Sequence, residues 1–162
     1  QGPYYLFGYS LGGTLAQGIA ARLRQQGEEV AFLGLLDTWP PETQNWAEKE
    51  ANGLDPAVLA EIERERQAFI AAQQGQGSSE LFNAIEGNYA DAVRLLTTAH
   101  SARFDGKATL FVAERTRTMD PQVAWAPWVA ALEVYSQDCA HVDIISPQAF
   151  EKIGPVLKDI LR

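Results

Sequence analysis

The sequence of 162 residues predicts an α/β fold in which a parallel sheet is flanked by helices. Two continuous apolar runs, at 4–7 and 30–36, have the length and composition of buried strands. The segment between them carries apolar residues at helical spacing, so that the three segments together predict a right-handed βαβ unit. Shorter apolar runs at 108–113 and 132–135 predict two further strands of the same sheet.

A glycine-flanked serine stands between the first predicted strand and the helix, where Gly8 to Gly12 read G-Y-S-L-G. A serine on such a turn points its hydroxyl away from the backbone, and its neighbours at 8 and 12 must be small to avoid a clash. The amide of Leu11 would lie at the helix N-terminus, where unpaired N–H groups stabilise a developing negative charge. The pattern predicts a nucleophile elbow, with Ser10 as the nucleophile and Leu11 as an oxyanion-hole donor.

The helix after the elbow and the strand after that helix have clear ends. Four apolar residues of the helix fall four positions apart, namely Leu11, Leu15, Ile19 and Leu23. Gly27 stands where this helix would stop. The run 30–36 ends at Asp37, and the prolines that follow cannot continue in the sheet. Ser10 and Asp37 are therefore both predicted at the carboxyl ends of parallel strands, which is the sheet edge where α/β folds place their sites.

Residues 39–105 contain no convincing strand. A helix is predicted from Pro56 to Gln74, followed by two shorter helices at about 80–86 and 89–100. The segment holds 11 acidic and 5 basic residues, which gives it a net charge of −6 out of the chain's −8. An acidic, all-helical insertion between two strands predicts a lid over the site. The alternative is a helical subdomain that only packs on the edge of the sheet.

The last third of the chain returns to the sheet pattern. Residues 114–128 read as an irregular loop before the strand at 132–135, and a second loop follows at 136–141. Ser146 and the proline after it cap a final helix, which Pro155 is expected to kink. The apolar residues expected to face inward from this helix are Phe150, Ile153, Leu157 and Ile160.

Composition excludes several classes of function. The net charge of −8 and a pI near 4.7 argue against nucleic acid or an anionic membrane as a partner. No apolar run has the length of a membrane span, and the sequence predicts neither a signal peptide nor a Cys/His metal cluster. The one cysteine, Cys139, cannot form an internal disulfide, so a reducing, cytoplasmic setting is expected. Because the chain opens directly on the serine-bearing strand, we expect it to be a fragment of a longer polypeptide, with the earlier strands outside it.

Only two histidines could serve as the general base that acyl transfer by a serine requires. His141 follows the last predicted strand, at the same sheet edge as Ser10. His100 ends a predicted helix, where a histidine often only complements the helix dipole. The sequence therefore favours His141.

The third member of the site would orient His141, and here the residues leave alternatives. Ser10, Asp37 and His141 occur in the Ser…acid…His order of α/β-hydrolases. Glu114 and, farther along, Asp120 follow the next predicted strand and are rivals. Asp37 is preferred because an aspartate directly at the strand end has a short reach, whereas Glu114 is closely followed by two arginines with which it could pair.

These residues carry a family resemblance. The GYSLGG elbow, an acid after the next strand, a long helical insertion and a late histidine resemble the thioesterase domains that end non-ribosomal peptide synthetases and polyketide synthases. Longer stretches such as GLLDTWPPETQNW and DCAHVDIISP extend the resemblance over nearly the whole chain. The resemblance implies an α/β-hydrolase fold with a mobile lid, and it favours Asp37 over Glu114.

The resemblance also implies a reaction and a partner. A preceding carrier-protein domain would present an acyl chain on phosphopantetheine, and the thioesterase itself would bind no cofactor. Ser10, deprotonated by His141, would take the acyl group while Asp37 holds the imidazole, and a hydroxyl of the chain would then release it as a macrolactone. Residues 1–162 would be the C-terminal part of the domain, with the lid at about 39–105; without the early strands and their oxyanion-hole amide, this stretch alone is expected to have little activity. The alternatives are a hydrolytic esterase or proofreading thioesterase, and a non-catalytic carrier-docking module.

Overall fold

The computed structural model describes residues 1–43, 60, 63, 91 and 94–161. The chain divides into two compact units, one made of residues 1–44 and 100–162 and the other of residues 45–99. The first unit contains four strands, β1 (Tyr4–Tyr9), β2 (Val30–Leu36), β3 (Phe104–Ala113) and β4 (Val129–Gln137), and three α-helices, α1 (Leu11–Gln25), α5 (Pro121–Trp125) and α6 (Pro147–Ile160). Three short 3₁₀ turns lie at Pro41–Thr43, Glu114–Thr116 and His141–Ile145.

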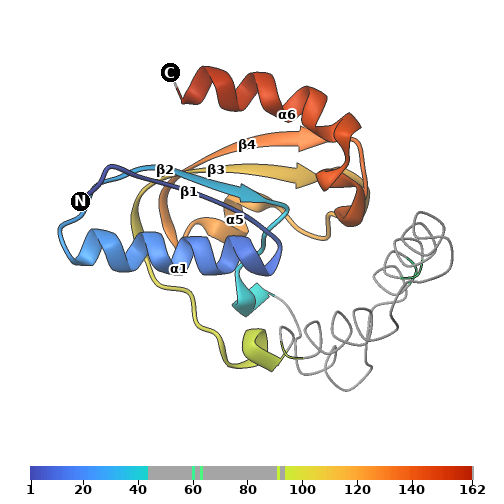
Figure 1. Ribbon diagram of the computed structural model, residues 1–162. Coiled ribbons are helices and arrows are strands. Elements are labelled where there is room, and N and C mark those ends of the chain that lie inside the picture. Colours follow the sequence, from blue (N-terminus) through green and yellow to red (C-terminus); the bar gives the residue numbers. More distant parts are fainter. Residues whose placement is uncertain (44–59, 61–62, 64–90, 92–93, 162) are drawn as a thin grey trace, which may run out of the picture. The chain divides into compact units, whose positions relative to one another are not determined.

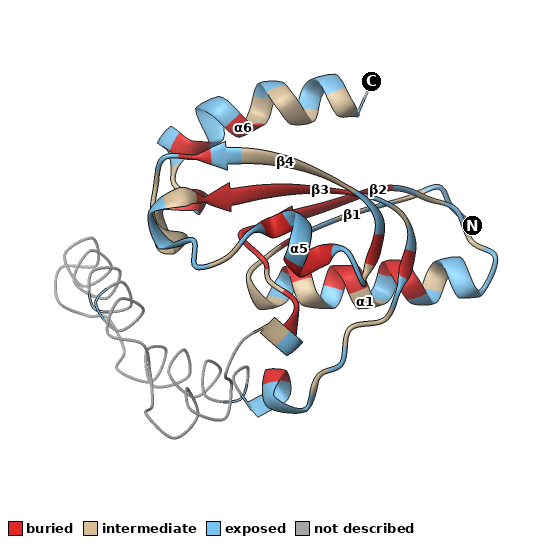
Figure 2. Ribbon diagram, turned by 180° about the vertical axis from the view of Figure 1, so that it is seen from behind, coloured by how far each residue is buried: buried red, intermediate tan, exposed pale blue. Residues whose placement is uncertain are grey.

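The four strands form one parallel sheet in the order β1-β2-β3-β4 (Figure 1). One face packs against α1 and α5, through residues such as Ala20, Leu35 and Trp125. The other face packs against α6, where Ile153 meets Phe111. Both faces are therefore covered, which is why β2 from Phe32 on and β3 from Ala108 on are continuously buried and, Thr109 aside, apolar (Figure 2).

The predicted parallel α/β sheet is confirmed, and its strands are longer than the apolar runs alone indicated. β2 matches the predicted range of 30–36. β1 continues to Tyr9, β3 begins at Phe104, and β4 spans Val129–Gln137 where the sequence predicts only 132–135. At the start of β3 and the end of β4, polar residues such as Asp105 and Gln137 hide the extra length, because a sheet ladder pairs backbone groups whatever side chains they carry.

The predicted irregular loop at 114–128 is wrong in one respect, because it contains helix α5. Asp120 caps this helix, and its Oδ1 accepts hydrogen bonds from the amides of Gln122 at 2.7 Å and Val123 at 3.2 Å. Pro121 occupies the first helical position. The Asp-Pro pair is the sequence signal for this helix. Asp120 is thereby occupied as a cap.

Helix α1 packs on the sheet through small residues. Its buried positions are Gly13, Ala16, Gln17, Ala20 and Ala21. Leu15 and Ile19 of the predicted leucine-rich stripe are instead 57% and 50% exposed. Small side chains let the helix axis lie close to the strands, and this rotates the larger residues outward. The helix ends at Gln25, and Gly27 follows with a φ of 79°, in agreement with the predicted stop.

Helix α6 begins as predicted, because the Ser146 hydroxyl accepts a hydrogen bond from the amide of Ala149 at 3.3 Å. The helix runs through Pro155 to Ile160. Ile153 is buried, but Phe150 is 39% exposed, so its predicted inward position is wrong. Ala149 takes that place because it faces the sheet one position earlier on the helix.

In the second unit, the structure describes helical conformation at residues 60, 63, 91 and 94–98, with Leu96 buried. The predicted helix at 80–86 and nearly all of 56–74 lie outside the described residues. Residues 39–44 and 100–105, which fall inside the predicted insertion, belong to the first unit.

A carboxylate clip joins the two segments of the first unit. One oxygen of Glu42 accepts a hydrogen bond from the Ser101 amide at 2.6 Å, and the other accepts one from the Ser101 hydroxyl at 2.8 Å. Burial raises the pKa of Glu42, but the hydrogen bonds from Ser101 and the nearby charge of His100 outweigh it, so the pKa lies below its ordinary value.

This clip predicts a loss of stability in acid. A depressed pKa in the folded state means that the contribution of Glu42 is present above the unfolded pKa, about 4.3, and is lost as pH falls through the folded value. The Glu42→Gln variant should therefore lower the free energy of unfolding at pH 7 by less than about 1 kcal/mol, because the carboxylate is exposed. In urea titrations at several pH values between 7 and 3, the free energies of unfolding of the wild type and the variant should converge as the pH falls. Glu151→Gln, at an exposed acid on α6, is the control. If the free energy of unfolding converged with that of the wild type for Glu151→Gln and not for Glu42→Gln, the role of the clip would be contradicted.

Candidate active site

Ser10 lies between β1 and α1 with φ 51° and ψ −121°, in a backbone region that costs a serine about 1–3 kcal/mol. Hydrogen bonds hold this conformation: its amide donates to the Leu36 carbonyl at 3.0 Å, and its carbonyl accepts from Gly13 at 3.0 Å and Thr14 at 3.3 Å. A serine at a helix N-cap usually bonds a helix amide with its own hydroxyl. Here the side chain makes no such bond. The turn therefore leaves the Ser10 hydroxyl directed at another partner.

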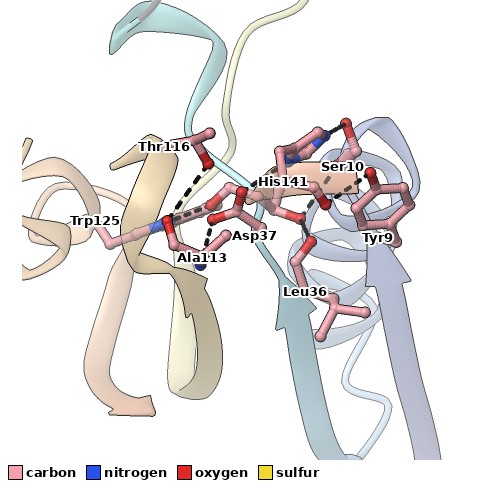
Figure 3. Close-up of polar contacts among 9 residues, drawn as sticks. Tyr9, Ser10, Leu36, Asp37, Ala113, Thr116, Trp125 and His141 are labelled. Atoms are coloured by element: carbon pink, nitrogen blue, oxygen red, sulfur yellow. Dashed lines mark hydrogen bonds and ion pairs between the residues drawn. The ribbon is translucent and has the colours of Figure 1, made fainter. Parts of the chain in front are cut away.

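That partner is His141, the first residue of the 3₁₀ turn after β4 (Figure 3). His141 Nε2 lies 3.2 Å from Ser10 Oγ, and Nδ1 lies 2.7 Å from Asp37 Oδ2. Both distances are within hydrogen-bond range. The structure thus brings the three predicted residues together in one line, with the imidazole between the hydroxyl and the carboxylate.

Asp37 is held by the backbone of two strands. It follows β2 directly with a φ of 41°, and its amide donates to the Phe111 carbonyl at 2.7 Å. The oxygen that does not face His141, Oδ1, accepts the Ala113 amide at 3.0 Å (Figure 3). The side chain is 4% exposed. A buried carboxylate with both oxygens engaged cannot swing away, so it fixes which imidazole nitrogen carries the proton.

The rival residues are engaged elsewhere. Glu114 forms an ion pair with Arg117, at 3.1 Å from Nε to Oε2, and accepts a hydrogen bond from the Ser136 hydroxyl. His100 is exposed and lies near Glu42. Burial raises the pKa of the Cys139 thiol, and the nearby carboxylates of Asp143 and Asp37 raise it further, which disfavours the reactive thiolate.

Thr38 supports the elbow from behind, and the sequence alone did not single it out. Its side chain is buried, and its hydroxyl lies 3.2 Å from the Ser10 carbonyl oxygen and 3.3 Å from that of Leu36. Its own carbonyl accepts a hydrogen bond from the indole N–H of Trp125 at 3.2 Å. Through Thr38, the core tryptophan, the acid loop and the serine turn form one hydrogen-bonded unit.

The steric demand predicted for Gly12 falls instead on Gly13. A Cβ at Gly8 would lie 2.2 Å from the Gly12 carbonyl oxygen, so glycine is required there as predicted. A Cβ at Gly12 would meet open space. A Cβ at Gly13 would lie 1.8 Å from the Thr38 hydroxyl oxygen. The first turn of α1 therefore packs directly on Thr38, which only the tertiary fold reveals.

Alanine substitutions at Gly12 and Gly13 should have different effects on the stability of the protein. Gly13→Ala should destabilise the protein by about 1–3 kcal/mol, because the methyl group must displace buried Thr38. Gly12→Ala should be neutral or stabilising by up to about 1 kcal/mol, because alanine favours a helix and its methyl group meets no atom. Urea denaturation midpoints provide the measurement. Equal midpoints for the two variants would contradict the contact between Gly13 and Thr38.

The Leu11 amide is placed to stabilise negative charge at Ser10. Leu11 is the first residue of α1, so its amide has no acceptor within the helix and can donate to an oxyanion formed at Ser10.

The described residues indicate no metal site and no membrane span. Among the described residues, no group of three His, Cys, Asp or Glu side chains could hold a metal ion. No described helix is long and apolar enough to cross a membrane. The arrangement can activate a serine hydroxyl for attack on an acyl carbon, with His141 taking the proton.

Comparison with known proteins agrees with this chemistry. A family model described as a thioesterase domain matches residues 1–159. Enterobactin synthase component F from Escherichia coli O157:H7 is 78% identical over the whole chain, which covers 13% of that protein. Vanchrobactin synthetase VabF from Vibrio anguillarum is 45% identical over 99% of the chain, which covers 6% of it. The solved structure of the thioesterase domain SrfTE, described as the structural basis for cyclization of the lipopeptide antibiotic surfactin, shares the fold. It superposes with a TM-score of 0.66 at 17% identity, and the match covers 100% of this chain and 69% of SrfTE.

Proposed function

Because the chain belongs to the thioesterase-domain family, we propose that it carries the chain-releasing thioesterase and cyclase centre of a non-ribosomal peptide synthetase. The observation that carries this proposal is the contact of His141 with Ser10 Oγ at 3.2 Å and with Asp37 Oδ2 at 2.7 Å. The chain spans only a small part of the curated relatives, 13% of enterobactin synthase component F. The reaction, substrate and partner given below are therefore parts of the proposal.

The first half-reaction transfers an acyl group from a carrier domain to Ser10. The substrate is a thioester on the phosphopantetheine arm of a peptidyl carrier protein domain, and this chain holds no cofactor of its own. The bond from Ser10 Oγ to the acyl carbon forms, the carbon–sulfur bond breaks, and the proton passes from Oγ through His141 to the leaving thiol. Asp37 stabilises the imidazolium that forms between these two proton transfers, and the Leu11 amide donates to the oxyanion.

The second half-reaction releases the chain by attack of a hydroxyl on the Ser10 ester. The acyl unit proposed is 2,3-dihydroxybenzoyl-serine, and repeated transfers from the carrier, in which a serine hydroxyl of one unit attacks the acyl ester of another, build a linear trimer on Ser10. The hydroxyl of the terminal serine then attacks the Ser10 ester, its proton passes through His141 to the leaving Ser10 Oγ, and the product is an enterobactin-type siderophore, a cyclic trimer closed as a lactone. The 78% identity with a protein named enterobactin synthase component F supports this choice. Ring closure in place of hydrolysis requires that water be excluded, and we assign that task to the insertion between β2 and β3. A cytoplasmic setting is part of the same proposal.

Product analysis tests this function. The complete synthetase, with dihydroxybenzoyl-serine loaded on its carrier domain, should release a cyclic trimer that mass spectrometry detects. Linear acids as the only product would replace the cyclase with the hydrolytic or proofreading thioesterase. Carrier binding with no turnover by any form of the protein would favour the non-catalytic docking module, which has no use for the aligned Ser10, His141 and Asp37.

A further inference from the structure

Tyr9 is the last residue of β1 and directly precedes Ser10. In the sheet it is paired with Leu36, the residue before Asp37. Its side chain packs against the apolar cluster under α6, which includes Leu36 and Phe111. The backbone that positions Tyr9 is therefore the same backbone that positions the nucleophile and the acid.

The side chain of Tyr9 makes two contacts with His141, 132 positions along the chain. The phenol hydroxyl donates a hydrogen bond to the His141 carbonyl oxygen at 3.1 Å (Figure 3). The phenol ring stacks on the imidazole, with ring centroids 4.9 Å apart and an interplanar angle of 27°. The imidazole is thus bonded along two edges, by Ser10 and Asp37, and covered on one face by Tyr9.

We propose that Tyr9 is a positioning residue for the general base, which fixes His141 through its hydroxyl and stabilises the imidazolium through its ring. This inference rests on the proposed function, because it assigns a role in the proton transfer from Ser10. Tyr9 would thereby join Ser10, His141 and Asp37 as a fourth residue of the site, one that acts through His141.

Each contact has a distinct physical effect. The hydroxyl bond restrains the first residue of the 3₁₀ turn, so that Nε2 stays within reach of Ser10 Oγ. The face of an aromatic ring is electron-rich and attracts a cation placed over it. It therefore favours the imidazolium formed when His141 accepts the Ser10 proton.

Among the described residues, several other groups can influence the pH dependence of this proton transfer, including Arg115 and Asp138, whose charges act at nearby Cys139. Asp37 faces His141 from the loop after β2, and Ser10 faces it from the elbow. Cys139 and Asp143 lie two positions on either side of His141 in the chain. None of these groups is substituted in the Tyr9 variants, so a difference in the midpoint of the pH–rate profile between two Tyr9 variants of the same ring shape reports the ring.

The test measures the rate at which an alkyl fluorophosphonate reacts with Ser10 in the complete synthetase, as a function of pH. In this reaction an Oγ–phosphorus bond forms, fluoride leaves, and His141 takes the proton, so no carrier substrate is needed. Tyr9→Phe removes only the hydroxyl. Pentafluorophenylalanine at position 9 also keeps the shape of the ring but reverses the charge distribution of its face. Tyr135→Phe is the matched control, because Tyr135 stacks on Phe111 and donates its hydroxyl to Glu133, away from the site.

Tyr9→Phe should lower the plateau rate about 3- to 10-fold, the value of one hydrogen bond, with the midpoint unchanged. The fluorinated ring should move the midpoint about half a pH unit lower than that of Tyr9→Phe. Rates and midpoints equal to those of Tyr135→Phe would overturn the inference. A wild-type chain that reacts no faster than its Ser10→Ala variant would instead remove the proposed function, and this inference with it.

Discussion

Replacing Ser10 with alanine should lower the turnover of a carrier-bound acyl thioester by on the order of 10⁶-fold. The hydroxyl is the only atom of the side chain that contacts His141 Nε2, and its loss leaves no nucleophile at the elbow. The measurement is single-turnover release of the acyl chain from the loaded carrier, with thermal unfolding recorded in parallel.

The controls for this result come from the same sheet edge. Ser136 lies at the end of β4, and its hydroxyl donates to Glu114, so Ser136→Ala should retain near-wild-type turnover. Because the three residues act as a unit, His141→Ala added to Ser10→Ala should cost little more than Ser10→Ala alone. Additive losses in the double variant would mean that His141 does not act on Ser10.

Asp37→Asn should lower turnover by about 10⁴-fold while leaving the protein folded. Asparagine has the same shape as aspartate. Its oxygen can still accept the hydrogen bond that the Ala113 amide donates to Asp37 Oδ1, at 3.0 Å in the wild type. The atom that faces Nδ1 then becomes an NH₂ group, which forces the imidazole into the wrong tautomer for accepting the Ser10 proton. Burst kinetics of acylation would measure the loss.

Glu114→Gln is the matched comparison, because Glu114 is the rival acid at the end of the neighbouring strand. Its carboxylate contacts Arg117 and Ser136, so this variant should change turnover less than about threefold. A large loss of turnover in Glu114→Gln together with a small loss in Asp37→Asn would mean that Glu114, and not Asp37, is the acid that orients His141.

The α/β-hydrolase-type fold was predictable because strong local signals agree with one another. Continuous apolar strands, helical spacing after Gly13 and the stop at Gly27 each predict the element that the structure contains. The residues of the site were also predictable as candidates, because parallel strands bring Ser10, Asp37 and His141 to one edge. The residues alone left Glu114 open, since two acids at neighbouring strand ends look alike until the backbone shows which one reaches His141.

What the sequence could not predict depends on contacts between distant segments. The demand for glycine at position 13 arises from Thr38, which lies on the loop after the next strand. The buried face of α1 consists of Gly13, Gln17 and three alanines, whereas its larger apolar residues Leu15 and Ile19 are exposed, because close approach to the sheet decides the rotation of the helix. The stacking of Tyr9 on His141 joins the two ends of the first unit and has no local signal.

The central claim is that Ser10 becomes covalently acylated with His141 as its base. The most direct measurement is intact-protein mass spectrometry after an acid quench, with the acylated carrier as donor, followed by peptide mapping. The account predicts a mass increment of one to three acyl units on the peptide that contains Ser10, and none in Ser10→Ala. An increment that persists in Ser10→Ala, on Cys139 or any other residue, or release of product without any acylated intermediate, would contradict it.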